Sequence, residues 1–184
     1  MDFESVFAML IDRFQKEEIC FALMGGFAMH ACGYSRSTED IDMLVLNEDM
    51  PKVKKIMGDL GYESLHESGD VSNFKGKLRE LGRVDFLHAH RHYTKNMLQR
   101  AKGCCIFNGK RTVKVLLPED IIGLKVQSSA NDPDRHHRDM ADIEALMRCN
   151  AGQLDLNLIR EYFALFARED ELNAILKRLN SHAQ

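Results

Sequence analysis

The sequence predicts an α/β (α+β) protein with two domains, an α/β domain at residues 1–116 and a helical domain at residues 117–184. Two observations support this fold class. Before Leu117-Pro118, segments with apolar residues at helical spacing alternate with short segments of β-forming residues. After this point, each segment has the helical spacing. We therefore place the domain boundary between residues 116 and 117.

The first sixty residues alternate between helix and strand patterns. We expect helices where apolar residues recur every three or four positions, at 3–17, 27–32 and 50–60. We expect strands at the short apolar runs, at 20–24 and 41–46. Gly25-Gly26 should end the first strand, and Gly33 should stop the helix that follows it.

Strand patterns dominate the rest of the first domain, at 62–67, 71–77 and 83–89. A short helix is expected over residues 93–102. Asn108-Gly109 separates two apolar segments, which predicts a β-hairpin. The second domain then contains helical patterns at 118–129, 134–149, 154–167 and 169–180.

Composition and charge are those of an ordinary globular protein. The chain has 184 residues, of which 45% are hydrophobic and 29% charged, and its net charge is −3. This charge gives no indication of binding to nucleic acid or to an anionic membrane by bulk electrostatics. A polyanionic substrate would therefore need local cations or metal ions.

Three further features predict a cytoplasmic protein that does not enter a membrane. The 5 cysteines are scattered without CxxC spacing, which indicates free thiols in a reducing compartment. The start "MDFESVF" is acidic and lacks the basic region of a signal peptide. No apolar run approaches the roughly 18 residues that a membrane helix needs.

Two carboxylates lie at the beginning of the apolar strand predicted at 41–46, one directly before it and one within it. Asp40 and Asp42 lie two positions apart, so in a strand they share a face, roughly 6.6 Å apart along the chain. Two such charges repel and raise each other's pKa unless a cation lies between them. Mg²⁺ prefers carboxylate oxygens and takes one or two of them from a protein. A metal site is therefore predicted, although an exposed strand edge or a calcium-like structural site would also fit.

Gly25-Gly26 predicts a phosphate-binding turn before the Asp40–Asp42 strand. A glycine pair between a strand and a helix allows positive φ and close approach of a ligand. Backbone amides at a helix start point toward an anion. Because the two strands should be neighbours, we expect this turn and the acid pair to lie together.

A third acid, Asp85, is flanked by Val84 and Phe86 in the apolar strand at 83–89. With Asp40 and Asp42 it would complete a set of three acids that holds two Mg²⁺ (or Mn²⁺) ions about 4 Å apart. Asp85 would then be a metal ligand or a general base. The alternative is a core acid that is satisfied by hydrogen bonds.

The segments "GGFAMHACGYSRSTEDIDMLV" and "RVDFL" together resemble the polymerase-β-like nucleotidyltransferase superfamily. Within it, the chain is similar to the small bacterial abortive-infection and toxin–antitoxin nucleotidyltransferases. Arg36, Thr38, Asp40 and Asp42 match that group's Arg-x-Thr-x-Asp-apolar-Asp pattern, and the resemblance covers residues 20–147. Many relatives have Ser at the position of Gly26, so phosphate binding here would depend on the backbone amide and on other groups.

The resemblance implies a mixed sheet flanked by helices, followed by a helical bundle. It also implies Mg-dependent transfer of a nucleoside monophosphate from an NTP such as ATP to an acceptor hydroxyl, with release of pyrophosphate. The nucleotide would lie between the two halves of the chain. The acceptor could be a protein, a tRNA end or a small molecule, and a cognate protein partner is plausible for this group.

The same resemblance implies roles for individual residues, and several of them have a structural alternative. Asp40 and Asp42 would hold both metals and Asp85 the catalytic one. Phosphate binding would involve Gly25, Gly26, Arg36, Thr38 and Lys125.

The residues themselves leave three of these roles open. Arg36 could instead pair with Glu39 or Asp40, and Thr38 could be a hydroxyl at the strand entry. Lys125 lies on an apolar helix stripe, so it needs an anionic partner, which could be a triphosphate or acids, either the acid cluster or a helix acid in a salt bridge.

The histidines of "HAHRH" and the activity itself also have two interpretations. His88, His90 and His92 are predicted to share one strand face, where they would line the mouth of the site or, less favourably, bind zinc. The chain as a whole could also be a non-catalytic nucleotide-binding or antitoxin-like module with the same fold.

Overall fold

The computed structural model describes residues 2–107 and 109–181, which divide into two compact units. The first unit runs to Ala31 and continues over Ser35–Leu116. The second contains Cys32–Tyr34 and the described residues from Leu117 onward. The main division therefore falls between Leu116 and Leu117, and the short segment after Ala31 belongs to the second unit.

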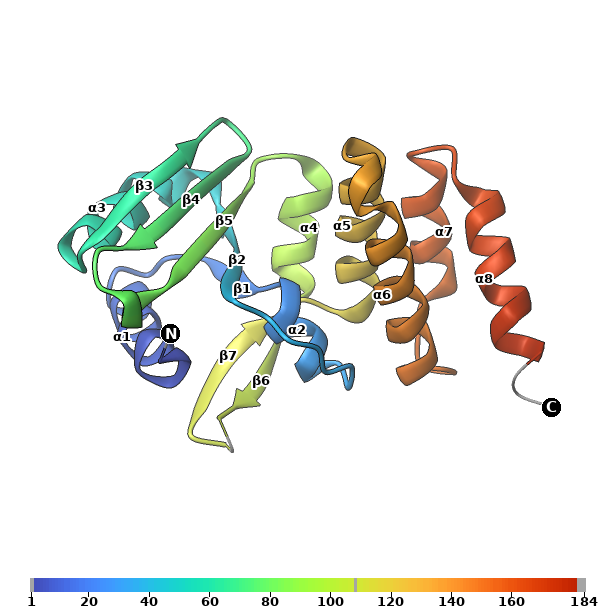
Figure 1. Cartoon of the computed structure of the whole chain (residues 1–184), viewed down its shortest axis with the longest axis horizontal. Coiled ribbons are helices and arrows are strands. Elements are labelled where there is room, and N and C mark those ends of the chain that lie inside the picture. Colours follow the sequence, from blue (N-terminus) through green and yellow to red (C-terminus); the bar gives the residue numbers. More distant parts are fainter. Residues whose placement is uncertain (1, 108, 182–184) are drawn as a thin grey trace. The chain divides into compact units, whose positions relative to one another are not determined.

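The described part of the first unit contains a mixed seven-stranded sheet with the order β3-β4-β5-β2-β1-β7-β6 (Figure 1). Strand β2 pairs in parallel with β5, and β1 pairs in parallel with β7, whereas the other neighbours are antiparallel. The bounds are β1 Phe21–Leu23, β2 Asp40–Leu46, β3 Tyr62–Glu67, β4 Val71–Gly76, β5 Arg83–Ala89, β6 Lys102–Ile106 and β7 Arg111–Val115. The predicted mixed sheet is confirmed.

Four α-helices of the first unit pack around this sheet in the described residues: α1 Phe3–Lys16, α2 Gly25–Ala31, α3 Met50–Asp59 and α4 His92–Arg100. Helix α1 buries the apolar stripe that its sequence predicted, and its Phe14 ring lies 6.1 Å from Phe86 of β5. Phe86 in turn contacts Phe74 of β4 edge to face at 5.7 Å. The core of this unit therefore lies between α1 and one face of the sheet.

The local predictions differ from the structure mainly at element ends. Gly25 and Gly26 do not separate strand from helix, because both already belong to α2, where Gly25 has φ +61. Helix α4 ends before Lys102, which begins β6. The predicted hairpin forms, with Ile106 opposite Arg111, while Asn108 lies outside the described residues.

The described second unit is helical, as predicted, with α5 Pro118–Asn131, α6 His136–Cys149, α7 Leu156–Ala164 and α8 Glu169–Ser181. Its core is apolar, but a buried polar contact joins α5 to α7, where the Tyr162 hydroxyl donates to Asp120 Oδ1 at 2.7 Å. Gly123 makes room for this ring, since a Cβ there would lie 2.7 Å from it. In the described residues, no helix has the length and apolar character that a membrane crossing requires.

Candidate active site

The sheet brings the three predicted acids to one face. Strands β2 and β5 are parallel and in register, so that Asp42 is paired with Asp85, and Asp40 lies two positions earlier on β2. The alternating residues Ile41 and Phe86 point to the other face and are 0% and 1% exposed. The convergence expected from the sequence is therefore present in the backbone register.

Burial and the charges of neighbouring acids raise the pKa of Asp42 and of Asp85. The pKa of Asp42 is raised to about 7, first by burial and then by the charges of Asp85 and Asp40. The pKa of Asp85 is also raised, by burial and by the charge of Asp40, against a hydrogen bond from Asn73 and the charge of Arg83. The acids thus need a proton or another cation to be stable together.

The diglycine holds Asp42 closely. Gly25 has φ +61, and a Cβ at this position would lie 2.0 Å from Asp42 Oδ2, so both the conformation and the space require glycine. The Gly26 amide donates a hydrogen bond to the Asp42 carboxylate. The turn at Gly25 and Gly26, which we expected to lie beside the acid pair, therefore contacts Asp42.

Thr38 explains why position 26 has no side chain. A Cβ at Gly26 would lie 2.5 Å from the Thr38 Cβ, and the Thr38 hydroxyl donates to the Asp40 carbonyl at 3.2 Å. Thr38 therefore fills the space next to the helix start and fixes the beginning of β2. The charge of Arg36 lowers the pKa of Asp42, which places its guanidinium within electrostatic range of the acids.

Asn73 lies beside Asp85, although no sequence pattern identifies it as a site residue. It is the register partner of Asp85 on β4, and its side chain donates a hydrogen bond to the Asp85 carboxylate. The other carboxylate oxygen, Oδ1, is buried and has no hydrogen-bond partner. A buried oxygen without a partner is costly, so a proton or another ligand atom at Oδ1 would be stabilising.

The carboxylate oxygens of the site are suitable ligands for a divalent ion, but the three acids are not all positioned to bind a single ion. Among the described residues, no group of three or more His, Cys, Asp or Glu side chains is placed to hold a metal ion. Asp42 and Asp85 supply two carboxylates with raised pKa, and the Oδ1 atom of Asp85 lacks a partner. Since Mg²⁺ takes one or two protein carboxylates and completes its shell with water and phosphate, Asp40 and Asp42, which share one face of β2, suffice for the fit.

Lys125 has its anionic partners within the second unit. Its Nζ atom donates to Asp139 Oδ1 at 3.0 Å and to Asp142 Oδ2 at 2.6 Å, and its side chain is 9% exposed. Of the two partners that the sequence left open, the structure shows the acids. Contact of Lys125 with a phosphate would require it to share or leave these carboxylates.

The prediction that three histidines share a strand face is wrong. Strand β5 ends at Ala89, and His92 begins α4. His88 is on the face opposite Asp85 and is 4% exposed, so it does not line the acid site. Its Nδ1 donates to the Gly69 carbonyl at 3.1 Å, and its Nε2 accepts from Ser72 at 3.0 Å, which gives it a structural role.

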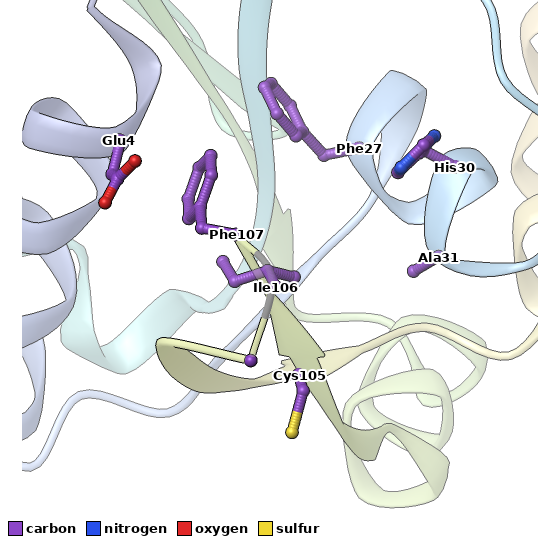
Figure 2. A pocket seen from close by; sticks show the side chains of 8 residues that line it. Glu4, Phe27, His30, Ala31, Cys105, Ile106 and Phe107 are labelled. Carbon is purple, nitrogen blue, oxygen red and sulfur yellow. The ribbon is translucent and has the colours of Figure 1, made fainter.

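A separate cavity of about 510 Å³ lies beside α2 in the first unit (Figure 2). Phe27 and Phe107 enter it, and the Phe7 ring contacts both of them edge to face, at 4.7 and 5.4 Å. None of the predicted site residues lines it; its walls are Glu4, Phe27, His30, Ala31, Cys105, Ile106, Phe107 and Gly109. The acid site is therefore a feature of the sheet face, distinct from this cavity.

The fold and the acid face define the class of protein. A mixed sheet with paired aspartates on parallel neighbouring strands, beside a diglycine, is the arrangement expected for a polymerase-β-like nucleotidyltransferase, and this assignment is confirmed. The family model described as "Uncharacterised nucleotidyltransferase" matches residues 5–181. The chain therefore belongs to this family of nucleotidyltransferases.

Solved structures support the fold. The antibiotic-resistance factor ANT(2″)-Ia in solution is 15% identical, with a TM-score of 0.67 and coverage of 99% of this chain and 100% of that one. The lincosamide antibiotic adenylyltransferase LnuA is 17% identical, with a TM-score of 0.57 and coverage of 78% and 95%.

A nucleotidyltransferase-like protein from Paracoccidioides brasiliensis is 20% identical, with a TM-score of 0.58 and coverage of 96% and 92%. No curated protein sequence matches the chain significantly. Similarity to the abortive-infection group in particular stays a prediction.

Proposed function

We propose that this protein transfers a nucleoside monophosphate from an NTP to an acceptor hydroxyl and requires Mg²⁺ or Mn²⁺. The observation that carries this proposal is the register of β2 and β5, which pairs Asp42 with Asp85 on one face, where burial first and neighbouring acids second raise the pKa of both. A protein without a cationic ligand has no physical reason to keep such a pair.

Asp40 and Asp42 are the proposed metal ligands, and Asp85 is the third acid. The bound ion would neutralise the phosphates and lower the pKa of the attacking hydroxyl. Asp85 accepts the hydroxyl proton at Oδ1, the oxygen that has no hydrogen-bond partner. A bond forms between the acceptor oxygen and the α-phosphorus, the bond from that phosphorus to the bridging oxygen breaks, and pyrophosphate leaves.

The proposed phosphate contacts lie next to the acids. Gly25 and Gly26 begin α2 in close contact with Asp42 and Thr38, so the proposed phosphate contacts at this turn are made by the backbone, and Arg36 contributes positive charge near Asp42. The Gly26 amide already donates to Asp42, so its role includes orienting that carboxylate. Thr38 supports the same turn, and Lys125 contributes only if it exchanges its two aspartates for phosphate.

The acceptor and the biological setting are also proposals. One ANT(2″)-Ia structure holds adenylyl-2″-tobramycin and the LnuA structure holds lincomycin, so aminoglycosides and lincosamides are reasonable test acceptors. Protein side chains and tRNA ends are tested beside them. A cytoplasmic location, a cognate protein partner and a toxin–antitoxin role follow from the sequence resemblance and are part of this proposal.

The test is label transfer with α-labelled NTPs, starting with ATP, in the presence of MgCl₂ and separate pools of acceptors. Transfer should require the metal and disappear in Asp42→Asn. Asp12→Asn is the matched control, because Asp12 is an exposed acid of α1 that pairs with Arg111. Binding of NTP without transfer to any pool would instead support a non-catalytic nucleotide-binding or antitoxin-like module.

A further inference from the structure

One part of the acid-bearing sheet face is open. In strands β3, β4 and β5, most positions that share this face are exposed or half-buried: Glu63, Leu65, His66, Val71, Asn73, Lys75, Arg83, Asp85 and Leu87; Ala89, at the end of β5, is buried. Helix α1 covers the opposite face through Phe14 and Phe86 (Figure 1). The acids therefore lie at the border of a surface on which a second substrate can rest.

Two rows of polar side chains cross the strands of this face. The first row is set by the register of β2, β5, β4 and β3 and contains Asp42, Asp85, Asn73 and His66. The second row lies two positions along each strand and contains Asp40, Arg83, Lys75 and Glu63. The first row carries the acids and the hydrogen bond to Asp85, and the second places two cations beside them.

Arg83 and Lys75 are directly opposite each other in the antiparallel pair of β4 and β5. Like charges in this position repel, although Asp40 is the register partner of Arg83, Glu63 that of Lys75, and the charge of Arg83 acts on Asp85. Both side chains are exposed, and neither forms an ion pair within the described residues. Glu63, the acid next to Lys75, lies 3.7 Å from Lys77 instead.

The spacing of the strands places Arg83 and Lys75 close to Asp85. Adjacent strands lie about 4.8 Å apart, and residues two apart on one strand lie roughly 6.6 Å apart. An anion held by Arg83 and Lys75 is therefore only one side-chain row away from Asp85 Oδ1. Arginine suits such an anion, because its planar group donates two parallel hydrogen bonds to a phosphate.

We propose that the acceptor carries a phosphate group, which Arg83 and Lys75 hold while the acceptor hydroxyl lies at Asp85 Oδ1. This inference rests on the proposed function and narrows its substrate class. The 3′-terminal nucleotide of an RNA and a small phosphorylated alcohol share this chemistry. The hydroxyl proton passes to Asp85, the new bond forms at the α-phosphorus of the NTP, and pyrophosphate leaves, so the phosphate of the acceptor is unchanged.

An aminoglycoside such as tobramycin carries no phosphate, so it serves as the acceptor without the group that Arg83 and Lys75 are proposed to hold. Beyond Asn73 the surface continues over His66 and over Leu65, which is 51% exposed. These two side chains offer a partly apolar area for the remainder of the acceptor.

The test compares acceptors that differ only in phosphate. A nucleoside, its 5′-monophosphate, a short RNA with a free 3′ hydroxyl, and tobramycin are offered with labelled ATP and MgCl₂. We expect transfer to the monophosphate or to the RNA, with at least tenfold lower kcat/KM for the nucleoside. Arg83→Gln and Lys75→Gln should raise KM for the phosphorylated acceptor at least tenfold, whereas the control Lys77→Gln should not.

Binding of the same acceptors, measured by calorimetry, provides a second readout that does not require turnover. Equal transfer to nucleoside and monophosphate, with both variants like wild type, overturns this inference but leaves the proposed function intact. Failure to bind either phosphorylated acceptor in the presence of a non-hydrolysable ATP analogue also overturns it. Absence of transfer to every acceptor, with ATP binding retained, instead contradicts the proposed function. The monophosphate and RNA arms identify which source of phosphate is used.

Discussion

Two groups of carboxylates, one in each unit, differ in how their charge is balanced. In the second unit, Asp139 and Asp142 both accept hydrogen bonds from the Lys125 ammonium. In the first unit, Asp42 and Asp85 are paired across two strands, and their pKa values are raised. The aspartates of the second unit are thus stabilised by Lys125. Those of the first unit would be stabilised by a bound cation.

This difference separates a structural cluster from a candidate catalytic one. A buried charge pair stabilises one packing arrangement, and removing one partner is strongly destabilising. Paired acids without a cation lower the stability of the free protein and gain from a bound metal. The following experiments test whether the two clusters behave in these opposite ways.

The largest expected effect is on transfer activity. Asp42→Asn should lower the rate at least about a thousandfold, equivalent to roughly 4 kcal/mol of transition-state stabilisation, because one metal ligand is lost. Asp139→Asn should retain activity per folded molecule. Steady-state rates of label transfer measure both, and a rate near wild type for Asp42→Asn would contradict the assigned role of the acid.

The buried group of Lys125, Asp139 and Asp142 should have a large effect on the free energy of unfolding. Lys125→Met leaves two buried acids without their ammonium partner, so the free energy of unfolding should fall by about 3–5 kcal/mol. The matched control is Lys177→Met on the exposed side of α8, with a change within about 0.5 kcal/mol. Urea unfolding measures the difference. A stable Lys125→Met protein with weakened NTP binding would favour the phosphate role of Lys125.

A smaller effect should appear in the pH dependence of stability. Folded Asp42 has a pKa of about 7 and an ordinary value of 3.8, so between these pH values the folded state holds the extra proton. Stability of the metal-free protein should therefore fall as the pH rises from about 4 to 7, and Asp42→Asn should recover on the order of 2 kcal/mol at pH 8.

Thermal unfolding at a series of pH values checks this dependence. Mg²⁺ with a non-hydrolysable NTP analogue should raise the melting temperature of wild type at pH 8 more than that of Asp42→Asn. A wild-type profile that matches Asp42→Asn across this range would show that the pKa of Asp42 is not raised in the free protein.

The smallest predicted effect concerns the orientation of Asp85. Asn73→Ala removes the hydrogen bond to its carboxylate and should lower kcat about tenfold, roughly 1.4 kcal/mol, with little change in KM for the NTP. Asn73→Ser keeps a donor and should recover part of kcat. The control on the same strand is Val71→Ala, which faces Leu87. Equal losses in Asn73→Ala and Val71→Ala would indicate a packing role only.

Several parts of the site were predictable because they depend on short-range periodicity. Asp40 and Asp42 share a face in any strand, and an acid such as Asp85 inside an apolar strand is conspicuous. The register that pairs Asp42 with Asp85, and Asp85 with Asn73, joins three strands far apart in the chain. Asn73 alone in "VSNFKG" is an ordinary polar strand residue, so nothing local identified it.

The surroundings of the histidines and of Lys125 could not be predicted from the spacing of residues in the sequence. The alternation of "HAHRH" would place His88 and His92 on one face only if the strand continued, but it ends at Ala89. For Lys125, the apolar helix stripe correctly demanded an anion, but Asp139 and Asp142 come from the next helix. Which anion a buried cation meets depends on helix packing, and this is not encoded in the spacing around the cation.

By itself, the sequence determined the class of fold, the alternation of helix and strand, and the identity of the three acids, because these depend on repeats of two to four residues. Tertiary structure decided the rest: that Gly26 and Thr38 compete for one space, that Asn73 holds Asp85, and that Arg83 lies opposite Lys75. Each of these contacts joins different strands or a strand and a helix. Its energy depends on register and packing, which only the folded chain specifies.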